Sequence, residues 1–248
     1  MKQFIISSLF VTASFIGGDA FAGDIDKKLQ AAMKSDIRTE AEVKRDRNRR
    51  PLQTLNFFGL KDDMKILEIM PGGGWYTKLL APIVADNGEY FAAFGTNTIE
   101  SRLVGKPGFK KMNIIEGNNK LRYDKGYILQ DIKISENNFD IVFTFRNYHS
   151  FKGDGRMRMN KAAFDALKPG GVYAVVGHTR RHMEPDNPEN GRRFDPVKVI
   201  KEVQAAGFKF EDFSSLHYRA DDELRYEVGR KTVTGNTDRF TLKFRKPK

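Results

Sequence analysis

Four short apolar runs recur in the middle of the chain. They are MKILEIM (64–70), GEYFAAFG (88–95), FDIVFTF (139–145) and GVYAVVG (171–177). Nearly continuous apolar runs of this length are typical of strands whose two faces are both covered. Because helical stretches separate these runs, the pattern predicts an α/β fold with an open, doubly wound, mostly parallel sheet.

Helix ends are marked at several positions. Residues 24–35 and 39–58 are predicted helices, and the second is expected to break or restart at Pro51, which has no N–H group to lose in a first turn. A later helix is expected to have Asp195 as its N-cap and to stop at Gly207.

The end of the chain changes to an alternating pattern. FKFEDFSSLH (208–217) and RFTLKFR (239–245) predict a last pair of strands. In the second run, three apolar side chains alternate with polar ones, so we expect an antiparallel strand near the C-terminus with its polar face half exposed.

The first 22 residues have the features of a secretory signal peptide. Lys2 precedes an apolar stretch over 4–16, and Ala20, Phe21 and Ala22 form an A-x-A cleavage site. This predicts cleavage near Ala22, a periplasmic or secreted protein, and no stable membrane insertion afterwards. A retained anchor is the alternative, although the stretch is short for a membrane span.

Composition limits the remaining chemistry. The 248 residues carry a formal net charge of +11 and no cysteine, which excludes disulfides and thiolate metal sites. We expect N-terminal helices over 23–62 that pack on a core domain of residues 63–248. The positive charge favours anionic partners, but no signature of specific nucleic-acid binding accompanies it.

The stretch LEIMPGGGWYT (67–77) carries the most informative motif. Its glycines follow the first predicted strand, and we expect Trp75 to begin a helix, so that bare backbone faces a crevice. A P-loop would continue with Gly-Lys-Ser/Thr, and a dinucleotide fingerprint would need a glycine at Thr77. Neither is present. A tight strand-to-helix turn without a ligand is the remaining alternative.

The spacing of Glu68, Gly72 and Gly74, with the ALKPGG turn (166–171), resembles class I S-adenosylmethionine-dependent methyltransferases. RDRNRRPLQTLNFFG (45–59), TFRNYHSF (144–151) and GNTDRFTLKFRKP (235–247) are similar to a group of exported, predicted bacterial methyltransferases. The resemblance implies a Rossmann-like fold and S-adenosylmethionine as cofactor. It places cofactor binding at Glu68, Pro71, Gly72, Gly73, Gly74 and Trp75.

Further cofactor contacts are expected where other strands end. The superfamily usually has an acid after the second strand, where this chain has Thr96 and Asn97, which could offer polar groups to a ribose. After the third apolar run (139–145) we expect Arg146 and Asn147 to bind cofactor or substrate. Arg146 could equally be a surface or ion-paired arginine.

The same loop supplies candidates for proton removal. His149 is the expected general base, with Tyr148 in reserve, and a hydrogen-bonded structural histidine is the alternative. His178, Arg180 and Arg181 are candidate ligands for an anionic substrate after the next strand. No metal site is expected, because His178, His182 and Glu184 lack a matching partner elsewhere.

A basic run, KRDRNRR (44–50), has two interpretations. It is either a solvated helix face or, through Arg45, Arg47 and Arg50, a segment that closes over the cofactor.

Three functions remain open from the sequence. The first is an exported S-adenosylmethionine-dependent methyltransferase that acts on a small or medium-sized acceptor. The second is a noncatalytic exported protein that binds a nucleoside-like or anionic ligand in the same crevice. The third is a basic surface for acidic polymers or lipid headgroups, which only the net charge supports.

Overall fold

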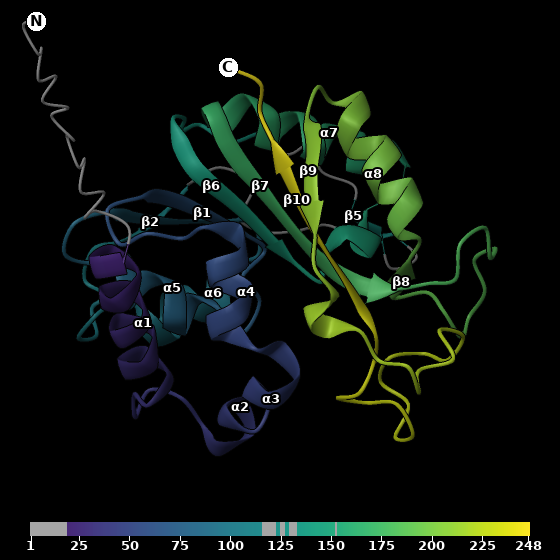
Figure 1. Ribbon diagram of the computed structural model, residues 1–248, viewed down its shortest axis with the longest axis horizontal. Coiled ribbons are helices and arrows are strands. Elements are labelled where there is room, and N and C mark those ends of the chain that lie inside the picture. The colour runs from purple at the N-terminus through teal and green to yellow at the C-terminus, as the bar shows by residue number, and fades with distance from the viewer. Residues whose placement is uncertain (1–18, 116–122, 125–126, 129–132, 152) are drawn as a thin grey trace, which may run out of the picture.

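The computed structural model describes residues 19–115, 123–124, 127–128, 133–151 and 153–248 (Figure 1). Residues 1–18 of the predicted signal peptide lie outside this set. Helix α1 (Asp19–Met33) begins ahead of the predicted cleavage site. Among the described helices, none is both long and apolar enough to cross a bilayer.

The centre of the molecule is a mixed sheet in the order β3-β2-β1-β6-β7-β10-β9, with β8 paired to the end of β7. Strands β1, β2, β3, β6, β7 and β8 are parallel, and β10 is antiparallel to both its neighbours. The strands are β1 (Lys65–Ile69), β2 (Glu89–Ala93), β3 (Met112–Ile114), β6 (Phe139–Phe145), β7 (Leu167–Thr179), β8 (Arg193–Phe194), β9 (Lys209–Phe213) and β10 (Arg239–Arg245). Strands β4 (Tyr123–Asp124) and β5 (Tyr127–Ile128) pair separately. The predicted mostly parallel sheet with an antiparallel C-terminal strand is confirmed.

Helices cover both faces of the sheet (Figure 1). The remaining helices are α2 (Glu40–Val43), α3 (Asp46–Arg49), α4 (Pro51–Phe58), α5 (Thr77–Val84), α6 (Asn97–Leu103), α7 (Gly153–Ala166) and α8 (Pro196–Ala205), with two 3₁₀ turns, η1 (Tyr148–Ser150) and η2 (Ser215–His217). Side chains of α1, α4, α5 and α6 form one apolar cluster with one face of the sheet, and those of α7 and α8 form another with the opposite face. Successive strand residues therefore alternate between two cores, as Ile66 and Leu67 do, which explains the continuous apolar runs.

Two predicted helix boundaries are present in the structure. Arg50 adopts φ 40° between α3 and α4, so the helix restarts at Pro51. Asp195 caps α8 by accepting a hydrogen bond from the Val197 backbone N–H at 2.9 Å. The expectation for Trp75 was wrong by two residues, because it lies in a turn and α5 begins at Thr77.

Two expectations about β7 and β10 also need correction. The ALKPGG segment (166–171), expected to form a turn, lies almost wholly within β7, where the pairing with β6 shifts in register; α7 ends at Ala166. The polar face of β10 is half exposed at Lys243 and Arg245, as expected, but buried at Arg239 and Thr241, which are 7% and 1% exposed. The buried part is covered because His217 of η2 contacts Thr241, with 2.7 Å between Nδ1 and Oγ1.

Candidate functional site

Three adjacent parallel strands end in the same uncommon backbone conformation. Met70, Phe94 and Arg146 follow β1, β2 and β6 with φ of 56°, 66° and 62°. Left-handed φ values are uncommon for residues other than glycine and cluster at functional sites. The carboxyl ends of the parallel strands are therefore the place to search for a ligand site.

A hollow of about 190 Å³ lies against the glycine loop. Gly72 and Gly73 border it, and a Cβ added to either would meet no atom within 4 Å. Gly74 differs, since its Cβ would lie 2.7 Å from Cγ2 of Ile99 and its φ is 79°. The first two glycines thus leave room for a ligand, whereas the third lets α6 approach the loop.

Glu68 anchors this loop from below. Its Oε2 accepts hydrogen bonds from Oγ1 of Thr77 at 2.7 Å and from the Tyr90 hydroxyl at 2.6 Å. Burial raises the pKa of the Glu68 carboxyl to about 7, although both hydrogen bonds act in the opposite direction. Glu68 also lines the hollow of about 190 Å³. Through its two hydrogen bonds it connects β1, on which it lies, to β2 and α5 next to the glycine loop.

The N-terminal helices form a wall of the same hollow. The indole N–H of Trp75 donates to the Glu42 carbonyl oxygen at 2.9 Å, and the Arg49 guanidinium lies 4.3 Å from the indole ring centroid. Behind them, the Tyr76 and Phe145 rings stack with centroids 3.6 Å apart. Segment α2–α3 is thereby held against the glycine loop by an aromatic and cationic stack.

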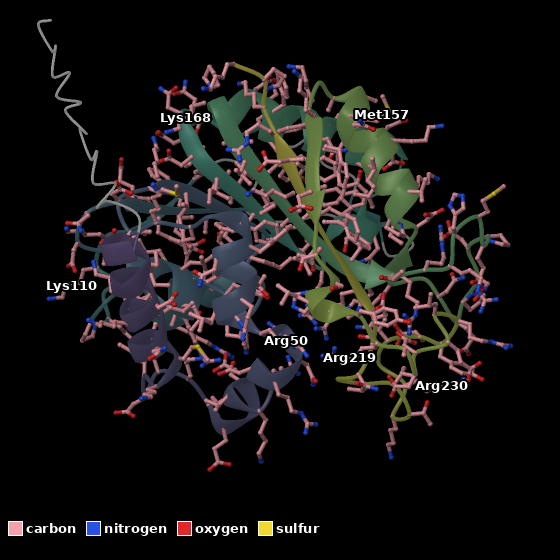
Figure 2. The ribbon with its side chains drawn as sticks, in the orientation of Figure 1. Arg50, Lys110, Met157, Lys168, Arg219 and Arg230 are labelled. Atoms are coloured by element: carbon pink, nitrogen blue, oxygen red, sulfur yellow. The ribbon has the colours of Figure 1, made fainter. Side chains whose placement is uncertain are left out.

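A second hollow of about 350 Å³ adjoins the first and shares Arg45, Arg49, Arg146 and Asn147 with it. Its other lining residues come from α3, from the end of β7, from the loops after β6 and β7, and from the segment that leads into β10 with the first residue of that strand: Asn48, His149, Ser150, His178, Arg192, Val228, Gly229, Thr234, Gly235, Thr237 and Arg239. No aspartate or glutamate is among these lining residues. Figure 2 shows further basic side chains, Arg50 and Arg219, at this edge of the molecule.

His149 borders this larger hollow and is neutral at pH 7. Burial lowers the pKa of the His149 imidazole to about 4, and the positive charges of Arg192 and Arg146 act in the same direction. A neutral imidazole can accept a proton, but one with so low a pKa is a weak base.

The neighbouring predicted residues also lie at the two hollows. The Asn147 amide donates to the carbonyl oxygens of Ile69 and Met70 at 3.1 and 3.0 Å, so it ties the end of β6 to the end of β1. Arg146 lines both hollows. His178 is 6% exposed at the floor of the larger one, with its Nδ1 2.9 Å from Oγ1 of Thr237.

Tyr148 is turned away from both hollows. Its hydroxyl donates to Glu202 at 2.9 Å and accepts from Asn160 at 3.0 Å beneath α7 and α8. Burial raises its pKa far above the ordinary tyrosine value. The reserve role assigned to Tyr148 in proton removal is therefore inconsistent with its position.

Five other predicted residues line neither hollow: Gly74, described above, and Thr96, Asn97, Arg180 and Arg181. Thr96 is buried and donates its hydroxyl hydrogen bond to Glu100, whereas Asn97 is exposed on α6. Arg180 packs on Phe194 and pairs with Asp186, and Arg181 is exposed to solvent. Thr96 and Asn97 do follow β2, and Arg180 and Arg181 follow β7, but none of the four borders either hollow.

Sequence reasoning missed Arg49, Tyr76 and Arg239. Within the basic run, Arg45 lines both hollows and Arg49 is buried, whereas Arg47 and Arg50 are exposed. Arg239 stands on the strand face that was expected to be half exposed. Composition gives no signal that separates a buried arginine from an exposed one in such runs.

Among the described residues, no cluster of three or more histidines, aspartates or glutamates is arranged to hold a metal ion.

Comparison with known proteins identifies the fold. No protein-family model and no curated protein matches the sequence. A solved S-adenosylmethionine-dependent methyltransferase from Aquifex aeolicus is 17% identical, with a TM-score of 0.58 over 89% of this chain and 97% of that one. The cyclase SpnF is 15% identical, with a TM-score of 0.58 over 90% of this chain and 93% of its own. Human N-acetylserotonin methyltransferase, solved with S-adenosylmethionine, is 12% identical, with a TM-score of 0.55 over 92% of this chain and 57% of its own.

These likenesses and the strand order show that the chain has the Rossmann-like fold of class I methyltransferases.

Proposed function

We propose that this protein is an S-adenosylmethionine-dependent methyltransferase that acts on a small or medium-sized acceptor. One observation carries the proposal: two hollows adjoin at the carboxyl ends of the parallel strands and share Arg45, Arg49, Arg146 and Asn147, and one of them borders open glycine backbone. A methyl donor in the smaller hollow would face an acceptor in the larger one.

The residues of the smaller hollow fit the methionine end of this cofactor. Gly72 and Gly73 leave space above the loop, and the guanidiniums of Arg49 and Arg146 are suited to a carboxylate. Bound S-adenosylmethionine would supply an electrophilic methyl group on its sulfonium. The protein then has to align the acceptor and, for an O–H or N–H acceptor, accept its proton.

His149 is the group that we propose for proton removal. It borders the larger hollow and is neutral at pH 7, so it can accept a proton from an acceptor there. Its low pKa limits this role while Arg146 and Arg192 outweigh Glu227 among the charges that act on the imidazole.

The second candidate function is noncatalytic ligand binding in the same two hollows. It is supported by the weak basicity of His149 and by the lack of a carboxylate in the lining of the larger hollow. The cyclase SpnF also shows that a protein named for another reaction shares this fold.

Calorimetry with S-adenosylhomocysteine tests the proposed cofactor site. We expect the wild-type protein to bind it and Gly73→Val to lose binding, because the added side chain projects into the hollow without meeting protein atoms. Gly191→Val is a matched control, since that exposed loop glycine also has room for a Cβ. Failure of the wild-type protein to bind either S-adenosylmethionine or S-adenosylhomocysteine would leave the second candidate function.

We also propose export, on the strength of the charged start, short apolar stretch and A-x-A site in residues 1–22. Mature protein should begin near Gly23 in the extracytoplasmic fraction, as read by N-terminal sequencing. Recovery of protein with an intact Met1 from the cytosol would contradict it.

A further inference from the structure

The larger hollow contains a concentration of positive charge that no lining residue balances. Five arginines border it, and none of the lining residues is an aspartate or glutamate. Of the five, Arg192 has a partner outside the lining, Glu227, with 2.7 Å between the guanidinium and the carboxylate. Arg45 is exposed at the rim. The remaining three are Arg49, Arg146 and Arg239.

Buried arginines elsewhere in the described chain are paired with carboxylates. Six arginines are buried, and four of them have an acidic partner: Arg38 with Asp46, Arg156 with Glu202, Arg180 with Asp186 and Arg193 with Asp222. The other two are Arg49 and Arg239, and both face the larger hollow. Because a buried charge is costly unless it is paired, this contrast points to a missing anion.

The hydrogen bonds of these arginines lead to the same conclusion. Arg239 donates to the Asn48 carbonyl oxygen at 2.7 Å, but its Nε is buried without a hydrogen-bond partner. The Nε of Arg146 is likewise buried and unpartnered. Arg38 and Arg180 also have a buried Nε without a hydrogen-bond partner, but each is paired with a carboxylate. Arg239 and Arg146 thus differ from them in having no such carboxylate, and a ligand that accepts hydrogen bonds would satisfy their free donors.

The three guanidiniums also repel one another. Burial lowers the pKa of Arg49 to about 9 and that of Arg239 to about 10, and in both cases the charge of Arg146 is the next cause. Arg49 and Arg239 therefore remain charged at pH 7. The three arginines reach the hollow from α3, from the end of β6 and from the start of β10, so the folded chain brings together cations that are remote in sequence.

We propose that the methyl acceptor carries an oxyanionic group, a phosphate or a carboxylate, which Arg239 binds in the larger hollow together with Arg49 and Arg146, the two arginines that also reach the smaller hollow and the cofactor's carboxylate. This rests on the methyltransferase function proposed above. Guanidiniums bind both oxyanions through paired, charge-assisted hydrogen bonds.

The cofactor is not sufficient to balance this charge. S-adenosylmethionine has one carboxylate but also an ammonium and a sulfonium, so its binding would add positive charge next to the cluster. An anionic acceptor would supply the missing negative charge and would also raise the basicity of His149.

Inorganic phosphate and acetate are the probes, each titrated at constant ionic strength against sodium chloride. We expect saturable stabilisation of the wild-type protein by at least one of them, measured by thermal unfolding and calorimetry. Arg239→Gln should weaken that binding roughly 10- to 100-fold, since a hydrogen bond to a charged group is lost. A response to phosphate alone would identify a phosphorylated acceptor, and a response to acetate a carboxylate.

Arg181→Gln is the matched control, because it removes the same charge from an exposed position after β7. It should keep the wild-type affinity for the probe. Equal weakening by Arg181→Gln and Arg239→Gln would overturn the proposal, because it would indicate a diffuse basic surface. Absence of saturable binding by either probe would also overturn it.

Parallel titration with S-adenosylhomocysteine separates this proposal from the proposed function. Arg239 lines only the larger hollow, so Arg239→Gln should leave the S-adenosylhomocysteine affinity unchanged. If S-adenosylhomocysteine binds but neither phosphate nor acetate does, the proposed anionic acceptor is wrong and the methyltransferase function stands. If phosphate or acetate binds in an Arg239-dependent way but S-adenosylhomocysteine does not, the methyltransferase function is wrong and the anion site stands.

Discussion

The Arg49 guanidinium lies over the Trp75 ring, 4.3 Å from its centroid, at the boundary between the N-terminal helices and the glycine loop. Trp75 is the only tryptophan in the chain and lines the smaller hollow. Its fluorescence therefore reports directly on that hollow.

We expect titration with S-adenosylhomocysteine to change the tryptophan emission, because a ligand in the smaller hollow alters the polarity around the indole. An unchanged spectrum at saturation, with binding established by calorimetry, would place the ligand elsewhere.

Gly74→Val should destabilise the fold by about 2–4 kcal/mol, from overpacking together with an unfavourable backbone conformation. The Cβ would lie 2.7 Å from Cγ2 of Ile99, and φ is 79°. Urea unfolding measures the loss. Gly73→Val is the comparison and should retain nearly all of the wild-type free energy of unfolding, since no atom lies within 4 Å of its Cβ. Equal losses in the two variants would show that Gly74 is not specifically a packing residue.

Glu68 should make stability fall as the pH rises toward and beyond neutrality. Its pKa of about 7 in the folded protein exceeds the ordinary value of 4.5, so the folded state holds the proton more tightly. This contribution is complete below about pH 4.5 and is lost as the pH rises through about 7.

Glu68→Gln keeps an oxygen that can accept from Thr77 and Tyr90 but no longer titrates. Relative to wild type, the variant should therefore gain a few kcal/mol in free energy of unfolding between pH 5 and pH 8. Urea unfolding at the two pH values tests this. A constant difference between the two proteins would mean that Glu68 does not titrate in that range.

His149 should remain neutral in the ligand-free protein well below pH 6, since its pKa is about 4. Imidazole resonances followed by NMR, and assigned with His149→Gln, measure this among the four histidines of the chain. Phosphate should raise the apparent pKa, because it offsets the charges of Arg146 and Arg192. A His149 pKa near 6.5 without phosphate would contradict the expected burial.

If His149 accepts the proton of the acceptor, His149→Gln should lower turnover by roughly 10²- to 10⁴-fold and leave the Kd for S-adenosylhomocysteine nearly unchanged. Joint loss of folding and cofactor binding would instead make it a structural residue.

The sheet and its principal helices could be predicted from the sequence because their determinants are local. Continuous apolar runs identify β1, β2, β6 and β7 as strands covered on both faces, and the glycine spacing after Glu68 resembles a known loop. Pro51 and Asp195 fix helix starts through the geometry of a few neighbouring residues.

The smaller hollow was partly predictable for the same reason. Glu68 and the glycine loop lie close together in the chain, so one sequence motif contains many of the residues that line this hollow. Arg146 and Asn147 were predictable because they directly follow a strand whose carboxyl end had to lie at the crevice.

The tertiary structure alone decided the larger hollow. Arg49, Arg146 and Arg239 come from three distant segments, and the antiparallel insertion of β10 between β7 and β9 brings the last of them to the site. An arginine in an alternating strand and one in a basic run have the same local appearance whether solvent, a carboxylate or a ligand faces them. The sequence by itself determined which segments form strands and where bare backbone is offered to a ligand. Only the folded chain determined which charges are buried together without partners, because burial and pairing depend on residues remote in sequence.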